Sequence, residues 1–312
     1  MIVENPLVIM RKAVSWSYFV GSALSSYLGP AFTIVIFARL APAGTAALRI
    51  WSGALVLAVW RRPWRTLRAA DPAGRWLIVA WGAVLGLLNL AFYQAIAILP
   101  LGTVAAIEFL PVIVLATFGA RTPRNIAAVL AVTAGVAVLT DARLTGAPLG
   151  FLFAFVDAVT FALYIVVAHR AARRLPGRLG GIDGLAAAML VACVVTAPFA
   201  VREVVPVLAG PRALAAALGV GVASVLPYVC DQMAMARMAR STYALLLALL
   251  PATATVVGVV VLRQSPSLLE IAGLTAVMLG VAVHEHGHDA EPPPEEQAVE
   301  EAAPASADLV GS

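Results

Sequence analysis

The chain has 312 residues, of which 62% are hydrophobic and 12% are charged, and its formal net charge is +4. Soluble domains contain about 25% charged residues, so a soluble fold could not bury this much apolar surface. The positive charge does not indicate a nucleic-acid-binding protein, because the arginines lie in links between apolar runs and form no continuous patch.

The apolar runs predict ten membrane-spanning helices, so we expect an all-α integral membrane protein. Two runs, the fifth and the tenth, are short for a full crossing and would stand nearly upright in the bilayer. The ten predicted spans cover residues 13–37, 42–60, 76–98, 101–119, 125–140, 148–168, 183–201, 213–236, 241–262 and 267–284.

The basic residues predict the orientation of these spans. With residues 1–12 in the cytoplasm, the inner segments contain fifteen Lys and Arg residues and the outer segments contain five. This bias predicts a multi-pass membrane protein with both termini cytoplasmic. Residues 285–312 are acidic and rich in proline, which predicts a disordered tail. The histidines His284, His286 and His288 could bind a metal ion, but we favour a solvated helix end and tail, because no rigid scaffold surrounds them.

The two halves of the chain resemble each other. "IEFLPVIVLATFGA" (107–120) and "LALLPATATVVGVV" (247–260) align with Pro111 and Pro251 in register. We therefore expect two repeats of five helices, residues 13–140 and 148–284. An odd number of spans makes the second repeat inverted, an arrangement found in many secondary transporters. Pro111 and Pro251, together with Pro30 and Pro227, either mark bends that allow the bundle to rock or are prolines that membrane helices tolerate routinely.

Four charged residues lie inside predicted spans: Arg49, Glu108, Asp157 and Asp231. A charge at the centre of an isolated span costs about 2.5–3.5 kcal/mol, so these side chains should face the interior of the bundle. Arg49, Glu108 and Asp157 lie at one depth, and Asp231 lies deeper. A carboxyl group that is partly removed from water can exchange protons near neutrality, which indicates a proton or substrate pathway. The alternative is a fixed ion pair, such as Arg49 with Glu108, that only holds helices together.

Polar and aromatic residues in neighbouring spans are candidates for lining such a pathway, or for hydrogen bonds between packed helices. They are Asn89, Tyr93, Gln94, Tyr164, Tyr228 and Gln232. A group of tryptophans near the first inner loop predicts an aromatic belt at the membrane interface. Its members are Trp60, Trp64, Trp76 and Trp81.

Three blocks resemble the EamA-type drug/metabolite transporters, and among these the bacterial threonine/homoserine exporters. They are "TAALRIWSG" (45–53), "NLAFYQAIAILPLGTVAAIEFLPVIVLA" (89–116) and "VLPYVCDQMAMARMARSTYALLLALLPATATVVGVVVL" (225–262). The resemblance implies two inverted five-helix repeats and efflux of small metabolites by proton antiport. By position it assigns family roles to Arg49, Glu108 and Asp231. The chain departs from the exporters at Leu250, where they carry an acid, and at Asp157, which matches no family position.

These observations predict a secondary transporter that exports small metabolites such as threonine or homoserine, with the proton gradient as energy source and no cofactor. Its expected partners are a small-molecule substrate and the lipid bilayer, while its oligomeric state stays open. Export of another solute, such as a drug, a purine or a sugar, is the alternative. An intramembrane enzyme is a remote one, because no histidine lies well inside a span and no nucleophile with a base is evident.

Overall fold

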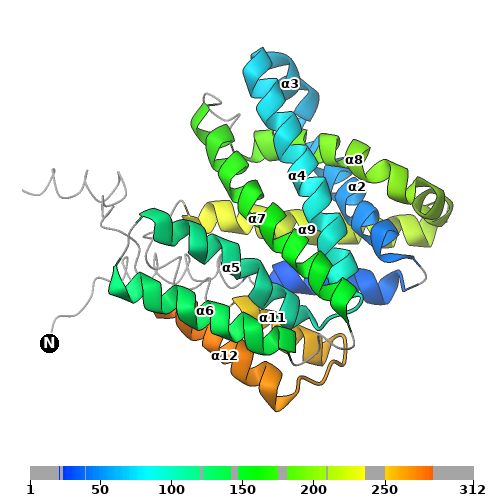
Figure 1. The fold of residues 1–312 in the computed structure, drawn as a ribbon. Coiled ribbons are helices and arrows are strands. Elements are labelled where there is room, and N and C mark those ends of the chain that lie inside the picture. Colours follow the sequence, from blue (N-terminus) through cyan, green and yellow to red (C-terminus); the bar gives the residue numbers. More distant parts are fainter. Residues whose placement is uncertain are drawn as a thin grey trace, which may run out of the picture.

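The computed structural model describes residues 21, 24–38, 40–119, 122–141, 147–174, 181–208, 210–235 and 250–283. Within these ranges all regular secondary structure is helical (Figure 1). The helices are Leu24–Ile36, α2 Pro42–Arg61, α3 Pro63–Ala69, α4 Pro72–Ile96, α5 Leu101–Gly119, α6 Pro123–Asp141, α7 Pro148–Arg174, α8 Ile182–Leu208, α9 Pro211–Met235, α11 Leu250–Val260 and α12 Leu268–Val283.

These helices follow the predicted spans closely and confirm an all-helical protein. Four stretches are long and apolar enough to cross a bilayer, Pro42–Arg61, Pro72–Ile96, Pro148–Ala171 and Ile182–Arg202. Shorter apolar helices account for most of the other predicted spans. The short helix α3 was not predicted, and the first part of the ninth span lies outside the described residues.

The helix starts follow from simple local chemistry. Six helices, α2, α3, α4, α6, α7 and α9, begin with proline, whose missing N–H is not needed in the first turn. The side chain of Asp71 accepts a hydrogen bond from the backbone N–H of Gly74 (2.9 Å) and caps α4. At the start of α12, the Ser267 N–H donates to Glu270 Oε2 (2.8 Å) and the Glu270 N–H donates to Ser267 Oγ (3.2 Å). This reciprocal capping box explains why a buried glutamate is tolerated there.

The helices form two groups (Figure 1). In one group α2, α4 and α9 pack with α8, and in the other α5 and α6 pack with α11 and α12. Helix α7 contacts both α4 and α5 and so lies between the groups. Each group therefore contains helices from both halves of the sequence. A site at the junction would be built from both halves of the chain.

A close backbone approach within the second group joins α6 and α12. A side chain on Gly135 would meet the Gly273 carbonyl oxygen at 2.7 Å, and a side chain on Gly280 would meet the Ala128 carbonyl oxygen at 2.8 Å. In the sequence, Gly273 lies 145 positions after Ala128, and Gly280 also lies 145 positions after Gly135. The two helices run antiparallel, because Gly273 of α12 lies against Gly135 of α6, whereas the later Gly280 lies against the earlier Ala128. The glycines allow the backbones to pack this tightly, as small residues commonly do in membranes.

Large apolar side chains cover the outside of the bundle. Val59, Leu130, Val194 and Val260, from four different helices, are 64–76% exposed. Water would disfavour such a surface on every side, whereas lipid tails are as apolar as these side chains. The exposed apolar surface and the apolar helices together indicate a multi-pass membrane protein.

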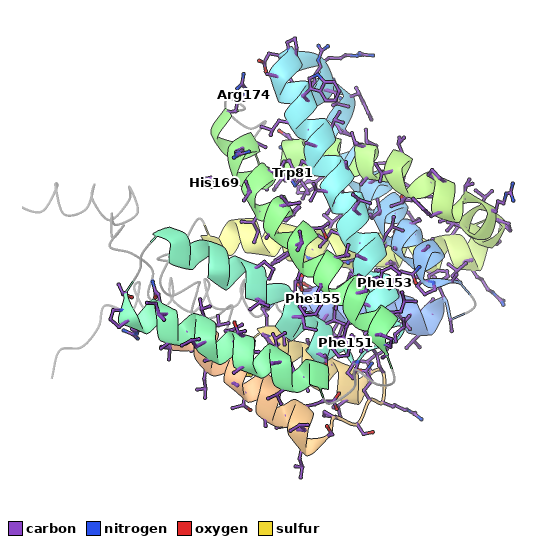
Figure 2. All side chains as sticks on the ribbon, viewed as in Figure 1. Trp81, Phe151, Phe153, Phe155, His169 and Arg174 are labelled. Atoms are coloured by element: carbon purple, nitrogen blue, oxygen red, sulfur yellow. The ribbon has the colours of Figure 1, made fainter. Side chains whose placement is uncertain are left out.

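Three of the four belt tryptophans lie at the surface. Trp60, Trp64 and Trp76 are 54%, 44% and 74% exposed. The prediction was wrong for Trp81, which is 4% exposed and packs 6.2 Å from the Tyr164 ring, between centroids. Helix α4 begins at Pro72, so Trp81 lies more than two turns inside it (Figure 2). Trp81 therefore belongs to the protein interior.

Arginines gather at the same end of the bundle, around α3. Arg62, Arg65 and Arg68 are exposed, and Arg61 Nε lies 2.6 Å from Asp183 Oδ1 at the start of α8. Figure 2 shows His169 and Arg174 toward this end of α7, and Phe151 toward the other. This arginine-rich end is the one that we predict to face the cytoplasm.

The prolines lie at different places in their helices. Pro111 and Pro227 lie inside α5 and α9, and Pro30 lies within Leu24–Ile36. Pro251 is the second described residue of α11, and residues 236–249 before this helix lie outside the described part of the chain. Helix α8 contains two prolines that the sequence reading did not single out, Pro198 and Pro206.

A matched pair of glycine substitutions tests the packing of α6 on α12. In Gly280→Ala the new methyl group meets Val132 and Ala128, and we expect a loss of about 1–3 kcal/mol of stability. In Gly219→Ala on α9 the methyl group meets nothing within 4 Å, and we expect a gain of about 0.5–1 kcal/mol. Thermal unfolding of the purified protein in detergent measures both. Equal shifts of the melting temperature in the two variants would contradict the packing.

Candidate functional site

The centre of the site is the guanidinium group of Arg49. Arg49 lies about two turns into α2, and its side chain is half-buried. Its Nε donates to Ser224 Oγ on α9 (3.2 Å), and its Nη1 donates to Asn89 Oδ1 on α4 (3.1 Å). One side chain thus connects three helices, and Ser224 comes from the opposite half of the sequence.

Both partners of Arg49 are held by their own helices. The Asn89 amide donates to the Leu85 carbonyl (2.9 Å), which leaves its oxygen free to accept from Arg49. The Ser224 hydroxyl donates to the Val220 carbonyl (2.7 Å), so its oxygen also accepts. These side chains are 4% and 1% exposed. Arg49 is therefore positioned by neutral groups that satisfy part of its hydrogen-bonding capacity without cancelling its charge.

The second feature is a pair of carboxyl groups near Arg49. Glu108 lies about two turns into α5 and interacts through charge with Arg49. Asp157 on α7 interacts through charge with Glu108, but here the two charges have the same sign and repel. Among the described residues, no hydrogen bond or ion pair within 4.0 Å joins Arg49 to Glu108. The described geometry is thus a loose cluster of one cation and two acids, and not a closed ion pair.

Asp157 differs from Glu108 in its surroundings. Its side chain is completely buried, while that of Glu108 is half-buried. In the described part of the chain, neither carboxyl oxygen of Asp157 has a hydrogen-bond partner. Buried polar groups normally have a partner, so this is the least satisfied acid of the site.

The other predicted site residues are distributed differently. Tyr93 is buried one turn beyond Asn89, on the same face of α4, and Gln94 is half-buried next to it. Tyr164 lies about two turns from Asp157 and packs against Trp81 and Phe161, away from the cluster. The side chains of Tyr228, Asp231 and Gln232 lie outside the described part of α9. Their roles stay predictions.

The sequence reading missed Ser224. A serine in an apolar helix usually bonds its own preceding turn, as Ser224 does with Val220, so nothing in the sequence marks it as a partner of Arg49. A second missed contact joins Trp51 Nε1 on α2 to Thr196 Oγ1 on α8 (3.0 Å). Both are contacts between segments far apart in the chain, which spacing alone does not reveal.

A helical membrane bundle with a cation and two acids at the junction of its helix groups is the arrangement expected of a membrane transporter. The comparisons with known proteins agree. Residues 148–284 match the model of the EamA-like transporter family. The family resemblance predicted from the sequence is confirmed.

Similar proteins extend the match over most of the chain. Over 281 residues the chain is 28% identical to the threonine/homoserine exporter RhtA of Salmonella typhimurium (strain LT2) and 27% identical to that of Escherichia coli (strain K12). Each alignment covers 88% of this chain and 88% of the relative. The family and these relatives are transporters, which points away from an enzyme and to a protein of the inner membrane.

A solved crystal structure has the same fold. It superimposes with a TM-score of 0.59 at 20% sequence identity, and the match covers 88% of this chain and 96% of the other. At this identity the likeness concerns the fold alone.

A double-mutant cycle tests the hydrogen bond between Arg49 and Asn89. Asn89→Leu removes the acceptor and leaves part of the guanidinium unsatisfied, so we expect a loss of about 1.5–3 kcal/mol of stability. In the Arg49→Leu variant the same change should cost less, giving a coupling energy of about 0.5–3 kcal/mol. Unfolding in detergent provides the free energies.

The control cycle combines Arg49→Leu with Ser267→Ala at the start of α12, which shares no contact with Arg49. These two costs should add within about 0.5 kcal/mol. Additive costs for Arg49 and Asn89 as well would show that the hydrogen bond contributes nothing.

Proposed function

We propose that the protein is a secondary transporter that exports amino acids such as threonine or homoserine by proton antiport. The observation that supports this proposal is that Arg49 and Glu108 belong to one cluster without forming a direct ion pair. A cation and an acid in this arrangement complement a solute that carries both charges.

Arg49 is suited to bind the carboxylate of an amino acid. A guanidinium group has five N–H donors, and the bonds to Asn89 and Ser224 use two of them. The remaining donors match the geometry of a carboxylate. Because its protein partners are neutral, Arg49 keeps a full positive charge for the solute.

Glu108 is suited to exchange a proton for the solute's ammonium group. The ionised carboxylate attracts an ammonium group, and the protonated carboxyl group does not. A proton and the solute therefore compete for Glu108, so that protonation from one side of the membrane releases the solute. Competition for one group is the property that antiport requires, since simultaneous binding of both would produce symport.

The arrangement of helices supports an inverted repeat with a rocking motion. If the helix Leu24–Ile36 corresponds to α7, then α2, α4, α5 and α6 correspond to α8, α9, α11 and α12. Under this assignment, the contact of α4 with α8 corresponds to the contact of α9 with α2. The helices α6 and α12 correspond to each other, and they form an antiparallel pair. The family match over residues 148–284 coincides with the proposed second repeat.

The arginine-rich end around α3 supports cytoplasmic termini for the proposed orientation. The site then lies about two turns from the outer ends of α2 and α5. Helix α7, which contacts both groups, is the element across which they would move.

Glu108→Gln tests the coupling role. In inside-out vesicles with an acidic interior, the wild type should accumulate labelled threonine or homoserine, and Glu108→Gln should fall to the level of vesicles without the protein. The matched control is Glu270→Gln, a second buried glutamate. It should keep its uptake, because glutamine can replace glutamate in a capping box. Normal uptake by the Glu108→Gln variant would exclude the coupling role.

Exchanging the two charges tests whether Arg49 and Glu108 are only a structural pair. Because Arg49 is oriented by Asn89 and Ser224, an arginine at position 108 lacks these partners. We expect no transport from the double variant Arg49→Glu, Glu108→Arg. Recovery of the transport that the single variants lose would establish a structural pair instead.

A panel of labelled solutes tests the solute class. We expect counterflow with small zwitterionic amino acids and none with sugars or purines, because these lack a carboxylate for Arg49. Counterflow of an uncharged solute but of no amino acid would contradict the proposal while retaining a transporter.

A further inference from the structure

The surroundings of Asp157 point to a role that is separate from the proton exchange proposed at Glu108. The side chain is buried inside the bundle, and within the described residues neither of its oxygens accepts a hydrogen bond. An ionised carboxylate buried in this way costs several kcal/mol unless it is paired. A neutral carboxyl group costs far less.

Among the described residues, the helices around Asp157 do not supply a compensating cation. Helix α4 contributes the neutral phenol of Tyr93, and α5 contributes the acid Glu108. On α7 itself the nearest basic side chains, His169 and Arg170, lie about three turns away. Arg49 acts on Glu108 and donates its hydrogen bonds to α4 and α9. In the part of the chain that the structure describes, the nearby charge that acts on Asp157 is therefore of the same sign.

Two neighbouring acids of unlike environment divide their protons unequally. Glu108 is largely buried but has the charge of Arg49 near it, whereas Asp157 is completely buried and has the like charge of Glu108 near it. When Glu108 is ionised, its charge opposes ionisation of Asp157. The pair therefore separates into a group that exchanges with the solute and a group that retains a proton.

We propose that Asp157 is a second proton-binding group of the transport site, protonated in the described conformation while Glu108 is ionised. It gives up this proton when the helix groups move and water reaches α7. The protein then moves a proton at Asp157 in addition to the proton exchanged at Glu108. The movement of this proton rests on the proposed transport function, whereas its presence on Asp157 does not.

Infrared spectroscopy tests the bound proton without any transport. A protonated carboxyl group has a C=O stretching band that shifts in D₂O. We expect the purified wild type to show such a band near neutral pH and Asp157→Asn to lose it. Glu108→Gln and Asp183→Asn should keep it, the latter because Asp183 is paired with Arg61. A wild type without the band, or an Asp157→Asn variant that retains it, would overturn the proposal.

The coupling ratio tests whether the proton moves. In proteoliposomes, the pH gradient that just balances a solute gradient gives the number of protons per solute. Asp157→Asn should still transport, because asparagine resembles the neutral acid, but with fewer protons per solute. An unchanged ratio would overturn the transport role of Asp157, and Asp183→Asn serves as the control with the wild-type ratio.

The outcomes separate this proposal from the proposed function. Should Asp157→Asn fail to fold, Asp157→Glu keeps the test open, because it should retain a shifted carboxyl band. A wild type that shows the band but moves no solute would contradict the transport function and leave the proton on Asp157 established. A wild type that transports the solute but lacks the band would contradict the proton on Asp157 and leave the transport function in place.

Discussion

A guanidinium group inside a membrane must be stabilised by the protein, and the site is organised around this requirement. Arginine stays charged under all physiological conditions, so Arg49 cannot be accommodated by losing its proton. Its hydrogen bonds run to Asn89 on α4 and Ser224 on α9. The charge thereby ties together helices from both halves of the chain, while the neutral partners leave it available to an anionic group. An aspartate in place of Ser224 would hold Arg49 more firmly but would compete with a solute.

The packing of the helices places Arg49 near the junction of the two helix groups. Glycines on α6 and α12 bring these helices into close contact, so that the second group behaves as a tight unit. The first group is connected by the contact of Trp51 with Thr196 and by the pair of Arg61 with Asp183. Glu108 belongs to the second group and Arg49 to the first. The distance between the two charged groups therefore depends on how the helix groups lie relative to each other.

Much of this arrangement is readable from the sequence. The helix boundaries follow from apolar runs and prolines, and the common depth of Arg49 and Glu108 follows from counting turns. The partners of Arg49 do not follow, because Ser224 is an ordinary residue whose importance depends on how α9 lies against α2. Trp81 was misplaced because its distance from the membrane surface depends on where α4 starts, which Asp71 determines by capping. Glu270 carried a visible signal, since Ser267 and Glu270 have the spacing of a capping box.

The orphaned acid could be found in the sequence but not understood from it. Asp157 stands out as a charge in an apolar helix, yet only the structure shows that the described residues of α4 and α5 provide it with no donor. Complete burial distinguishes it from Glu108, although the two residues occupy similar depths. The difference lies in long-range contacts, which the local sequence does not encode.

Competition between a proton and the solute at Glu108 is the central claim, and proton release on solute binding tests it most directly. The purified protein in weakly buffered detergent solution is mixed with an amino acid that it transports, and a pH-sensitive dye reports the protons released. The account predicts release by the wild type and no release by Glu108→Gln. Binding of the solute to the wild type without any proton release would contradict it.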